Sequence, residues 1–292
     1  MKSVKHKQLV SFDKTLIGYD IIGRGPEAIV LCHGLGGSLI AWSPFYEAFK
    51  DKYRFITWDY RGLYSSQKPK DTTKLTIDDH CRDLALILKK EKVTRAVFAG
   101  WSMGVQVCLE FFRKHARLYK GMILINGTSG YPYHAAFNSP LTRYIIPKTN
   151  QLLRKLGPKL QPKLKPIAKF VIDSDDFIKI VAKLGMIHHN LDSKIFRQVA
   201  KDVVNTDLSL YTQLLDRLAE HDASDVLAKI NVPTLIIAGT KDVMTPSHIA
   251  RGMAEQIKDS ELFILNNASH YSLMEFPDLI NERISQFLSN LK

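Results

Sequence analysis

Short apolar runs alternate along the chain with stretches in which apolar and polar residues are spaced as in helices. Thr76 to Glu91 and Val105 to Phe112 have the length and pattern of helices, and Thr76 can cap the first of them. Strands that alternate with helices form a mostly parallel sheet covered on both faces. We therefore predict an α/β fold with a mostly parallel central sheet flanked by helices. The predicted strands are Gln8 to Phe12, Thr15 to Ile22, 29–32, 54–58, 95–99, 121–125, 234–239 and 262–265.

The middle of the chain has a different pattern. From residue 132 to 218 it is helical and basic without a convincing strand, and the strand pattern resumes only near Val232. A long helical insertion at one point of a sheet fold predicts a separate cap. We therefore divide the chain into a first core segment (1–131), a mainly helical cap inserted before the last two strands (132–218) and a second core segment (219–292).

A proline repeat lies inside the predicted cap. Pro158, Pro162 and Pro166 follow one another at a four-residue spacing. Because proline lacks an N–H donor and clashes with the preceding helical turn, this spacing predicts a broken, extended connector and excludes one continuous α-helix. The apolar residues between Phe177 and Val181 predict a further cap helix.

One glycine-flanked serine stands between a predicted strand and a predicted helix. The stretch Gly100-Trp101-Ser102-Met103-Gly104 follows the apolar run at 95–99 directly. A sharp turn at this place forces strained backbone angles on the serine, requires small neighbours and lifts the hydroxyl out of the fold. Ser102 is therefore a candidate nucleophile.

Two later strands lead to residues that could assist this serine. The run at 234–239 leads to Asp242, and the run at 262–265 leads to His270. A hydroxyl is a poor nucleophile at neutral pH, so His270 would accept its proton while Asp242 orients the imidazole. The run at 121–125 leads to Asn126 and no carboxylate, which favours Asp242 as the acid.

The chain order Ser102, Asp242, His270, together with the glycine-rich loop from His33 to Gly37, resembles the α/β-hydrolase family from about residue 8 onward. The resemblance implies a serine esterase or lipase-like member whose insertion is the cap domain. It also implies that the backbone N–H groups of Leu35 and Met103 bind the oxyanion, and that neither a metal nor an organic cofactor is required.

This resemblance is specific for the fold and much less so for the substrate. It favours a serine hydrolase that cleaves carboxylic esters through an acyl-enzyme. The elbow Gly-Trp-Ser-Met-Gly is also similar to that of pimeloyl–acyl-carrier-protein methyl ester esterases. A carbon–carbon bond hydrolase or enol-lactonase and a non-catalytic ligand-binding receptor on the same fold are further alternatives. The complete set of Ser, Asp and His argues against the receptor.

Some conspicuous residues are expected to act outside the chemistry. Asp59-Tyr60-Arg61-Gly62 resembles a second motif of the family and is interpreted as structural, with Tyr64 in place of an expected glycine near the mouth of the pocket. His33 is expected to hold loops together. His188 and His189 are interpreted as non-catalytic, because adjacent residues on a helix point apart.

The charge distribution adds a separate signal. The 292 residues carry a formal net charge of +12, and no Asp or Glu occurs between residues 111 and 172. Such asymmetry favours an anionic partner at the basic cap, either a membrane surface or an acyl carrier protein. No nucleic-acid-binding motif accompanies the charge, so we expect no nucleic acid.

Composition also bears on the compartment. The three cysteines, Cys32, Cys81 and Cys108, are scattered, and no apolar run approaches the ~20 residues that span a bilayer. We expect reduced thiols, no secretory signal and a cytoplasmic location, with a small-molecule or lipid-like ester as substrate. The oligomeric state is left open.

Overall fold

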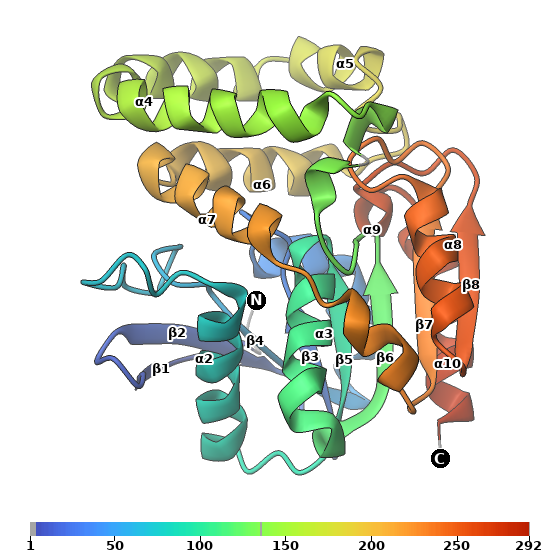
Figure 1. Cartoon of the computed structure of the whole chain (residues 1–292). Coiled ribbons are helices and arrows are strands. Elements are labelled where there is room, and N and C mark those ends of the chain that lie inside the picture. Colours follow the sequence, from blue (N-terminus) through green and yellow to red (C-terminus); the bar gives the residue numbers. More distant parts are fainter. Residues whose placement is uncertain (1–3, 135, 292) are drawn as a thin grey trace.

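Eight strands form one central sheet in the computed structural model, which describes residues 4–134 and 136–291 (Figure 1). The strand order is β1-β2-β4-β3-β5-β6-β7-β8. The β1·β2 and β2·β4 pairs are antiparallel and the other pairs are parallel, which confirms the predicted fold class. The strands are β1 (Val4–Val10), β2 (Leu16–Ile22), β3 (Glu27–Cys32), β4 (Tyr53–Trp58), β5 (Ala96–Trp101), β6 (Tyr119–Ile125), β7 (Thr234–Gly239) and β8 (Ser260–Leu265).

Helices cover both faces of the sheet and enclose one apolar core on each side. Strand residues of alternating direction divide between the two cores, with Val30 and Phe98 on one side and Ile29 and Val97 on the other. The first core is closed by α2 (Ile77–Lys90), α3 (Met103–His115) and α8 (Ser247–Gln256), and the second by α1 (Ser43–Phe49) and α10 (Pro277–Asn290). The short helices η1 (Leu39–Trp42), η2 (Ala116–Leu118), η5 (Ser224–Lys229) and α9 (Ser272–Glu275) complete this part.

Two details of the first elements follow from local side chains. Thr76 caps α2 as predicted, because its hydroxyl accepts from the Asp79 N–H while the Asp79 carboxylate accepts from the Thr76 N–H. The first strand ends earlier than predicted. Lys14 has φ 69° and the Asp13 carboxylate accepts from the Thr15 N–H, so the turn begins at Ser11.

The segment between β6 and β7 is entirely helical where it forms regular structure, and it lies above the carboxyl ends of the parallel strands (Figure 1). Position 135 of this segment, and positions 1–3 and 292 of the predicted core segments, lie outside the described residues. The elements are η3 (Pro132–His134), η4 (Ala136–Asn138), α4 (Thr142–Asp173), α5 (Asp176–Lys183), α6 (Ser193–Asn205) and α7 (Leu208–Glu220). The predicted helix near Phe177 is α5.

The prediction of an extended connector at the proline repeat is wrong, because α4 stays helical through all four of its prolines. Spacings of eleven and four residues place these prolines on one side of the helix, so the lost hydrogen bonds fall on that side alone. The opposite face is held by packing, with Asn150, Gly157 and Ile172 buried beneath the helix.

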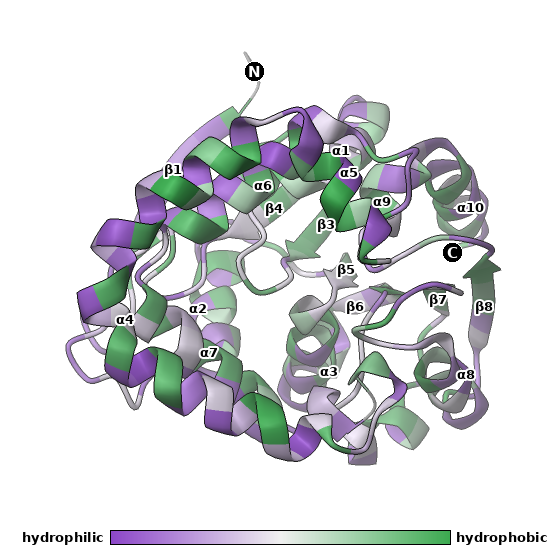
Figure 2. Ribbon diagram, turned by 90° about the horizontal axis from the view of Figure 1, so that it is seen from above, coloured by the Kyte–Doolittle hydropathy of each residue, from purple (hydrophilic) through white to green (hydrophobic). Residues whose placement is uncertain are grey.

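The helix α4 follows a bend made by the two helices beneath it. Its first half lies along α7, where Asn150 donates to Asp216 at 3.2 Å. Its second half lies along α6, where Arg197 donates to the Ile172 carbonyl. At the junction of α6 and α7, Gln161 donates to the Thr206 carbonyl at 2.6 Å. The prolines therefore allow α4 to curve with the junction, as the view from above shows (Figure 2).

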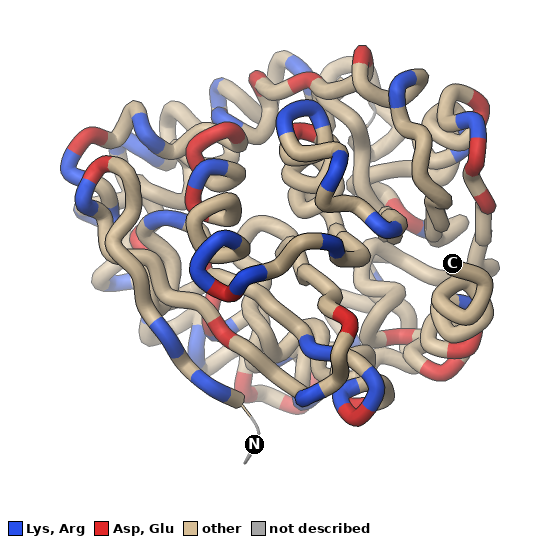
Figure 3. Tube along the Cα trace, turned by 90° about the horizontal axis from the view of Figure 1, so that it is seen from below, with Lys and Arg blue, Asp and Glu red and all other residues tan. Residues whose placement is uncertain are grey.

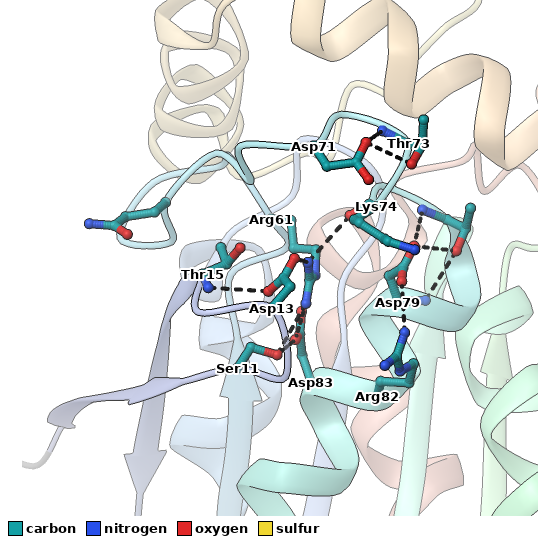
Figure 4. A network of polar contacts seen from close by, with 12 residues as sticks. Ser11, Asp13, Thr15, Arg61, Asp71, Thr73, Lys74, Asp79, Arg82 and Asp83 are labelled. Carbon is teal, nitrogen blue, oxygen red and sulfur yellow. Dashed lines mark hydrogen bonds and ion pairs between the residues drawn. The ribbon is translucent and has the colours of Figure 1, made fainter.

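Arg61 of the second motif anchors the loop after β4. Its guanidinium is fully buried and donates to Asp83 at 2.7 Å and to Asp13 at 2.6 Å, and it also reaches the Ser11 hydroxyl (Figure 4). A buried cation with several partners holds the β1–β2 turn, the loop and α2 together. This is the structural role expected of the motif.

Tyr64 adopts the backbone conformation of the glycine that it replaces, with φ 47°. Its hydroxyl donates to the Gly36 carbonyl at 2.6 Å. The phenol therefore fixes the glycine-rich loop at a cost in backbone strain, which a glycine would avoid.

The three cysteines are free and buried. Within 4–134 and 136–291, none of the helices is long and apolar enough to cross a membrane.

Candidate active site

The turn between β5 and α3 has the geometry that its sequence predicts. Ser102 has φ 57° and ψ −119°, a strained conformation for a residue with a side chain. A Cβ added at Gly100 would come within 2.4 Å of the Gly104 carbonyl oxygen, and one added at Gly104 within 2.0 Å of the Cys32 carbonyl oxygen. Both glycines are therefore required for the serine to stand at the end of the strand.

The structure brings the three predicted catalytic residues together from the ends of three strands. The Ser102 hydroxyl lies 2.9 Å from His270 Nε2, and His270 Nδ1 lies 2.9 Å from Asp242 Oδ2. Ser102 follows β5, Asp242 follows β7 and His270 follows β8. The Asp242 side chain is fully buried, whereas Ser102 borders a cavity. This arrangement can transfer a proton from the hydroxyl to the imidazole.

Asp242 is held as a carboxylate by its neighbours. Its Oδ1 accepts from the backbone N–H groups of Met244 and Thr245, at 2.8 and 2.9 Å. Its Oδ2 accepts from the Thr245 hydroxyl and from Asn126 Nδ2, both at 2.8 Å. Burial raises the pKa of Asp242, but the charge and hydrogen bond of His270 with these donors lower it further, so that its pKa lies below the ordinary value.

The loop that carries His270 is fixed by two side chains that the sequence analysis missed. The buried Glu275 accepts from the Ser269 N–H at 2.7 Å and from the His188 N–H at 2.7 Å. Trp101 Nε1 donates to the His270 carbonyl at 2.9 Å and so ties this loop to the serine turn. The only signal in the sequence was the position of Trp101 beside Ser102, because the other contacts join distant segments.

Leu35 and Met103 place their N–H groups on the two sides of the serine. A Cβ added at Gly34 would lie 3.1 Å from Ser102 Cβ, so the backbone before Leu35 passes against the nucleophile. Met103 is the first residue of α3, where N–H groups lack helical partners. Among the described residues, neither N–H donates to another backbone group outside regular elements. Both can therefore donate to a bound oxygen.

The side chain of His33 holds the base of this loop and points away from the serine. Its Nδ1 accepts from Trp42 Nε1 at 3.1 Å, and its Nε2 lies 2.6 Å from the Thr57 hydroxyl. Burial lowers the pKa of His33 to about 3, which keeps the ring neutral and suited to accept one hydrogen bond and donate another. His188 and His189 lie apart from the serine, stacked on each other at 3.9 Å.

The cavity at Ser102 has a volume of about 230 Å³. Apolar and aromatic side chains dominate its wall, and no Lys, Arg, Asp or Glu from the described part of the chain lines it. A second apolar cavity of about 480 Å³ lies under α4, α5 and α6. The two share Leu35, Trp101, Tyr211 and Tyr271 as a common wall. One elongated apolar molecule could therefore occupy both.

Comparison with known proteins agrees with this arrangement. The alpha/beta hydrolase fold family matches residues 27–277, which is most of the chain. The chain belongs to the α/β-hydrolase fold family. The resemblance noted from the sequence is thereby confirmed, and the Ser102 turn of this α/β-hydrolase lies inside the matched range.

Individual relatives of this α/β-hydrolase are distant and differ in activity. A putative carbamate hydrolase of Agrobacterium fabrum is 26% identical over 89% of this chain and 92% of its own length. 3-Oxoadipate enol-lactonase 1 of Acinetobacter baylyi is 26% identical, with 92% of each chain covered. Among solved structures, a bromoperoxidase from Bacillus anthracis superimposes with a TM-score of 0.78 at 20% identity, covering 98% of this chain and 100% of its own. This last likeness concerns the fold alone.

Proposed function

We propose that this protein is a serine hydrolase that cleaves uncharged carboxylic esters through an acyl-enzyme. The observation that carries the proposal is the continuous hydrogen-bonded chain from Ser102 through His270 to the buried Asp242, which opens on an apolar cavity. A hydroxyl paired with an imidazole and a carboxylate is the arrangement that activates serine for acyl transfer.

The reaction follows from the positions of these groups. His270 Nε2 accepts the Ser102 proton as Oγ attacks the ester carbonyl, and the oxygen of that carbonyl becomes an oxyanion. The N–H groups of Leu35 and Met103 donate to this oxyanion. The protonated His270 then gives its proton to the departing alcohol, which leaves an acyl group on Ser102. Water, deprotonated by the same imidazole, releases the acid and restores the hydroxyl.

The lining of the cavity supports a neutral substrate. A carboxylate on the substrate would lose its hydration in the cavity, and no cationic side chain from the described part of the chain lines the wall to compensate for that loss. The related enol-lactonase is named for an acidic substrate, 3-oxoadipate enol-lactone. We therefore favour esters with apolar groups on both sides of the ester bond over substrates of that kind.

The test is covalent labelling of Ser102 combined with turnover of aryl esters. A fluorophosphonate should label the native protein and leave Ser102→Ala unlabelled, and native protein should release a burst of phenol equal to its concentration from a p-nitrophenyl ester. Ser102→Ala should lower kcat by roughly 10⁴- to 10⁶-fold.

Ser289→Ala, which changes an exposed serine of α10, is the matched control and should behave as the native protein. Labelling that persists in Ser102→Ala would refute the assignment. Stoichiometric labelling without any ester turnover would instead favour the ligand-binding alternative.

A further inference from the structure

The large apolar side chains that this protein exposes are concentrated on the outer layer of the cap. Apart from Val10, Tyr64 and Leu279, every strongly exposed large hydrophobic residue of the described chain lies between residues 131 and 184. Phe170 is 78% exposed and Leu184 is 68% exposed. Monomeric proteins rarely leave such sets of side chains in water without a partner. The set on α4 comprises Tyr144, Ile145, Leu152, Leu153, Leu156, Leu160, Leu164, Ile167, Phe170 and Val171.

The proline repeat arranges these side chains in parallel rows. Its four-residue unit brings a leucine back at 152, 156, 160 and 164, and a lysine at 155, 159 and 163. Residues four apart are neighbours on a helix surface, so the leucines form one row and the lysines a second row beside it. The buried side of α4 faces the opposite way, onto α6 and α7. The outer face of α4 is thus amphipathic, with apolar and cationic rows in the same surface.

The cations of this face are available for a partner. Lys155, Lys159 and Lys163 are exposed and form no ion pair with any residue that the structure describes. No carboxylate interrupts the chain between residues 111 and 172. By contrast, the side of the molecule opposite the cap carries both signs close together (Figure 3). The excess positive charge is therefore a property of the cap and not of the surface as a whole.

We propose that the outer face of α4 docks on the surface of an anionic lipid bilayer. A basic amphipathic helix with large apolar side chains lies in the plane of the headgroups, where lysines meet lipid phosphates and leucines reach the acyl boundary. Both halves of α4 lie at the top of the molecule, farthest from the sheet, so that the bent helix can rest on one plane (Figures 1 and 2).

Two other occupants fit this face less well. A second copy of the chain would bring two rows of lysines together, which like-charge repulsion opposes. An acidic protein would match the lysines but would have to cover a long row of leucine, isoleucine and phenylalanine side chains as well. A lipid surface satisfies both rows without a specific complementary shape.

The position of the second cavity gives the docking a consequence, which rests on the proposed esterase function. Ala168, Val171 and Ile172 of α4 form part of its wall, and Val171 is itself 42% exposed. The helix that contacts the lipid therefore also borders the apolar cavity that leads to Ser102. An apolar ester dissolved in the bilayer would have a short path to the site.

Vesicle co-sedimentation tests the docking independently of catalysis. Native protein should sediment with vesicles of phosphatidylcholine containing about one third phosphatidylglycerol and stay in solution with phosphatidylcholine alone. The triple variant Lys155→Glu, Lys159→Glu, Lys163→Glu should lose at least about a hundredfold in partitioning, because each lysine near an anionic surface contributes close to a factor of five to ten. A triple variant Leu156→Ser, Leu160→Ser, Ile167→Ser should lose as much.

Matched controls place the same changes on the core. Lys52→Glu, Lys89→Glu, Lys258→Glu reverses three exposed lysines outside the cap, and Leu279→Ser removes an exposed leucine of α10. Both should bind as native protein does. Circular dichroism of every variant establishes that it is folded.

A tryptophan at position 160 reports the apolar contact directly. The native tryptophans, Trp42, Trp58 and Trp101, are all buried, so Leu160→Trp adds a single exposed indole. Its emission should shift to the blue on anionic vesicles and be quenched by brominated acyl chains. An unshifted emission would overturn the proposal, as would equal binding by all the variants. Loss of binding in the lysine variant alone would also overturn it and would favour an acidic protein partner. Concentration-dependent dimers that the leucine variant abolishes would favour a second copy.

Discussion

Three residues near the site hold backbone conformations that side chains disfavour. Ser102, Asn126 and Tyr64 all have positive φ, at 57°, 44° and 47°. Each such conformation costs about 1–3 kcal/mol, although asparagine tolerates it better than most residues. Each also positions a functional contact, since Ser102 reaches His270, Asn126 reaches Asp242 and Tyr64 holds Gly36. Strain collected at one end of the sheet is what a site built for chemistry requires.

Asn126 offers a test of how Asp242 is positioned. Replacing it by the isosteric aspartate, Asn126→Asp, changes the donor at 2.8 Å into a second carboxylate. Two neighbouring carboxylates resist ionising together, so the pKa of Asp242 should rise and the acidic limb of kcat/KM should move to higher pH. We expect kcat at neutral pH to fall by about ten- to a hundredfold.

The control for this variant is Asn267→Asp, which adds the same charge at another residue of positive φ, exposed and in the loop before His270. It should leave the pH profile in place. If both variants shifted the acidic limb equally, the effect would come from net charge and not from the contact with Asp242.

The sequence located the residues of the site for a simple reason, and it missed others for a related one. Ser102, Asp242 and His270 each follow an apolar strand, and parallel strands bring their carboxyl ends to one edge. Asn126 also follows a strand but was noted only for lacking a carboxylate. Its amide reaches a residue 116 positions away. Pairing of this kind depends on tertiary contacts that a linear pattern does not contain.

At the scale of elements, α4 shows where local propensity loses to packing. Proline disfavours a helix interior by about 3 kcal/mol, and Pro158, Pro162 and Pro166 therefore predicted a break. All three lie on one side, however, and the buried side rests on α6 and α7 with Gly157 against Leu208. The core strands and α2 carried no such conflict, so their predicted positions agree with the structure to within a few residues. The proline repeat bends the helix instead of ending it.

The second cavity under α6 can be tested by filling it. Ala200 lines this cavity, and Ala200→Trp would place an indole within its volume of about 480 Å³. If long acyl chains extend past Tyr211 into this space, kcat/KM for long-chain esters should fall by at least tenfold while that for acetyl esters stays nearly unchanged.

Gln198→Trp puts the same side chain on the exposed side of α6 and serves as the control. An equal loss for short and long esters in Ala200→Trp would mean that the variant distorts the cap. No loss for either ester would place the acyl chain elsewhere.

At the scale of the whole molecule, several buried groups make stability depend on pH. Burial lowers the pKa of His33 to about 3, and burial together with the charge of Arg61 lowers that of His80 to about 3. Both rings are neutral in the folded protein at pH values where an unfolded histidine, with a pKa near ~6.5, binds a proton. Burial has the opposite sign for Asp59, whose pKa it raises to about 6, so that the folded carboxyl keeps a proton that the unfolded one releases.

These shifts predict loss of stability in mild acid. Between about pH 6.5 and 3 the unfolded chain binds more protons at His33 and His80 than the folded chain, so the free energy of unfolding falls as the pH falls. Asp59 works against this only between about pH 4 and 6, and it is one group against two. His80 also buries both ring nitrogens without a hydrogen-bond partner among the described residues. Denaturant unfolding of His80→Leu across this range should show a slope smaller by about 1 kcal/mol per pH unit, with stability at neutral pH equal to or above that of the native protein. His248→Leu, at an exposed histidine of α8, is the comparison. An equal change of slope in both variants would contradict the assignment to His80, and an unchanged slope in His80→Leu would show that this ring is not neutral in the fold.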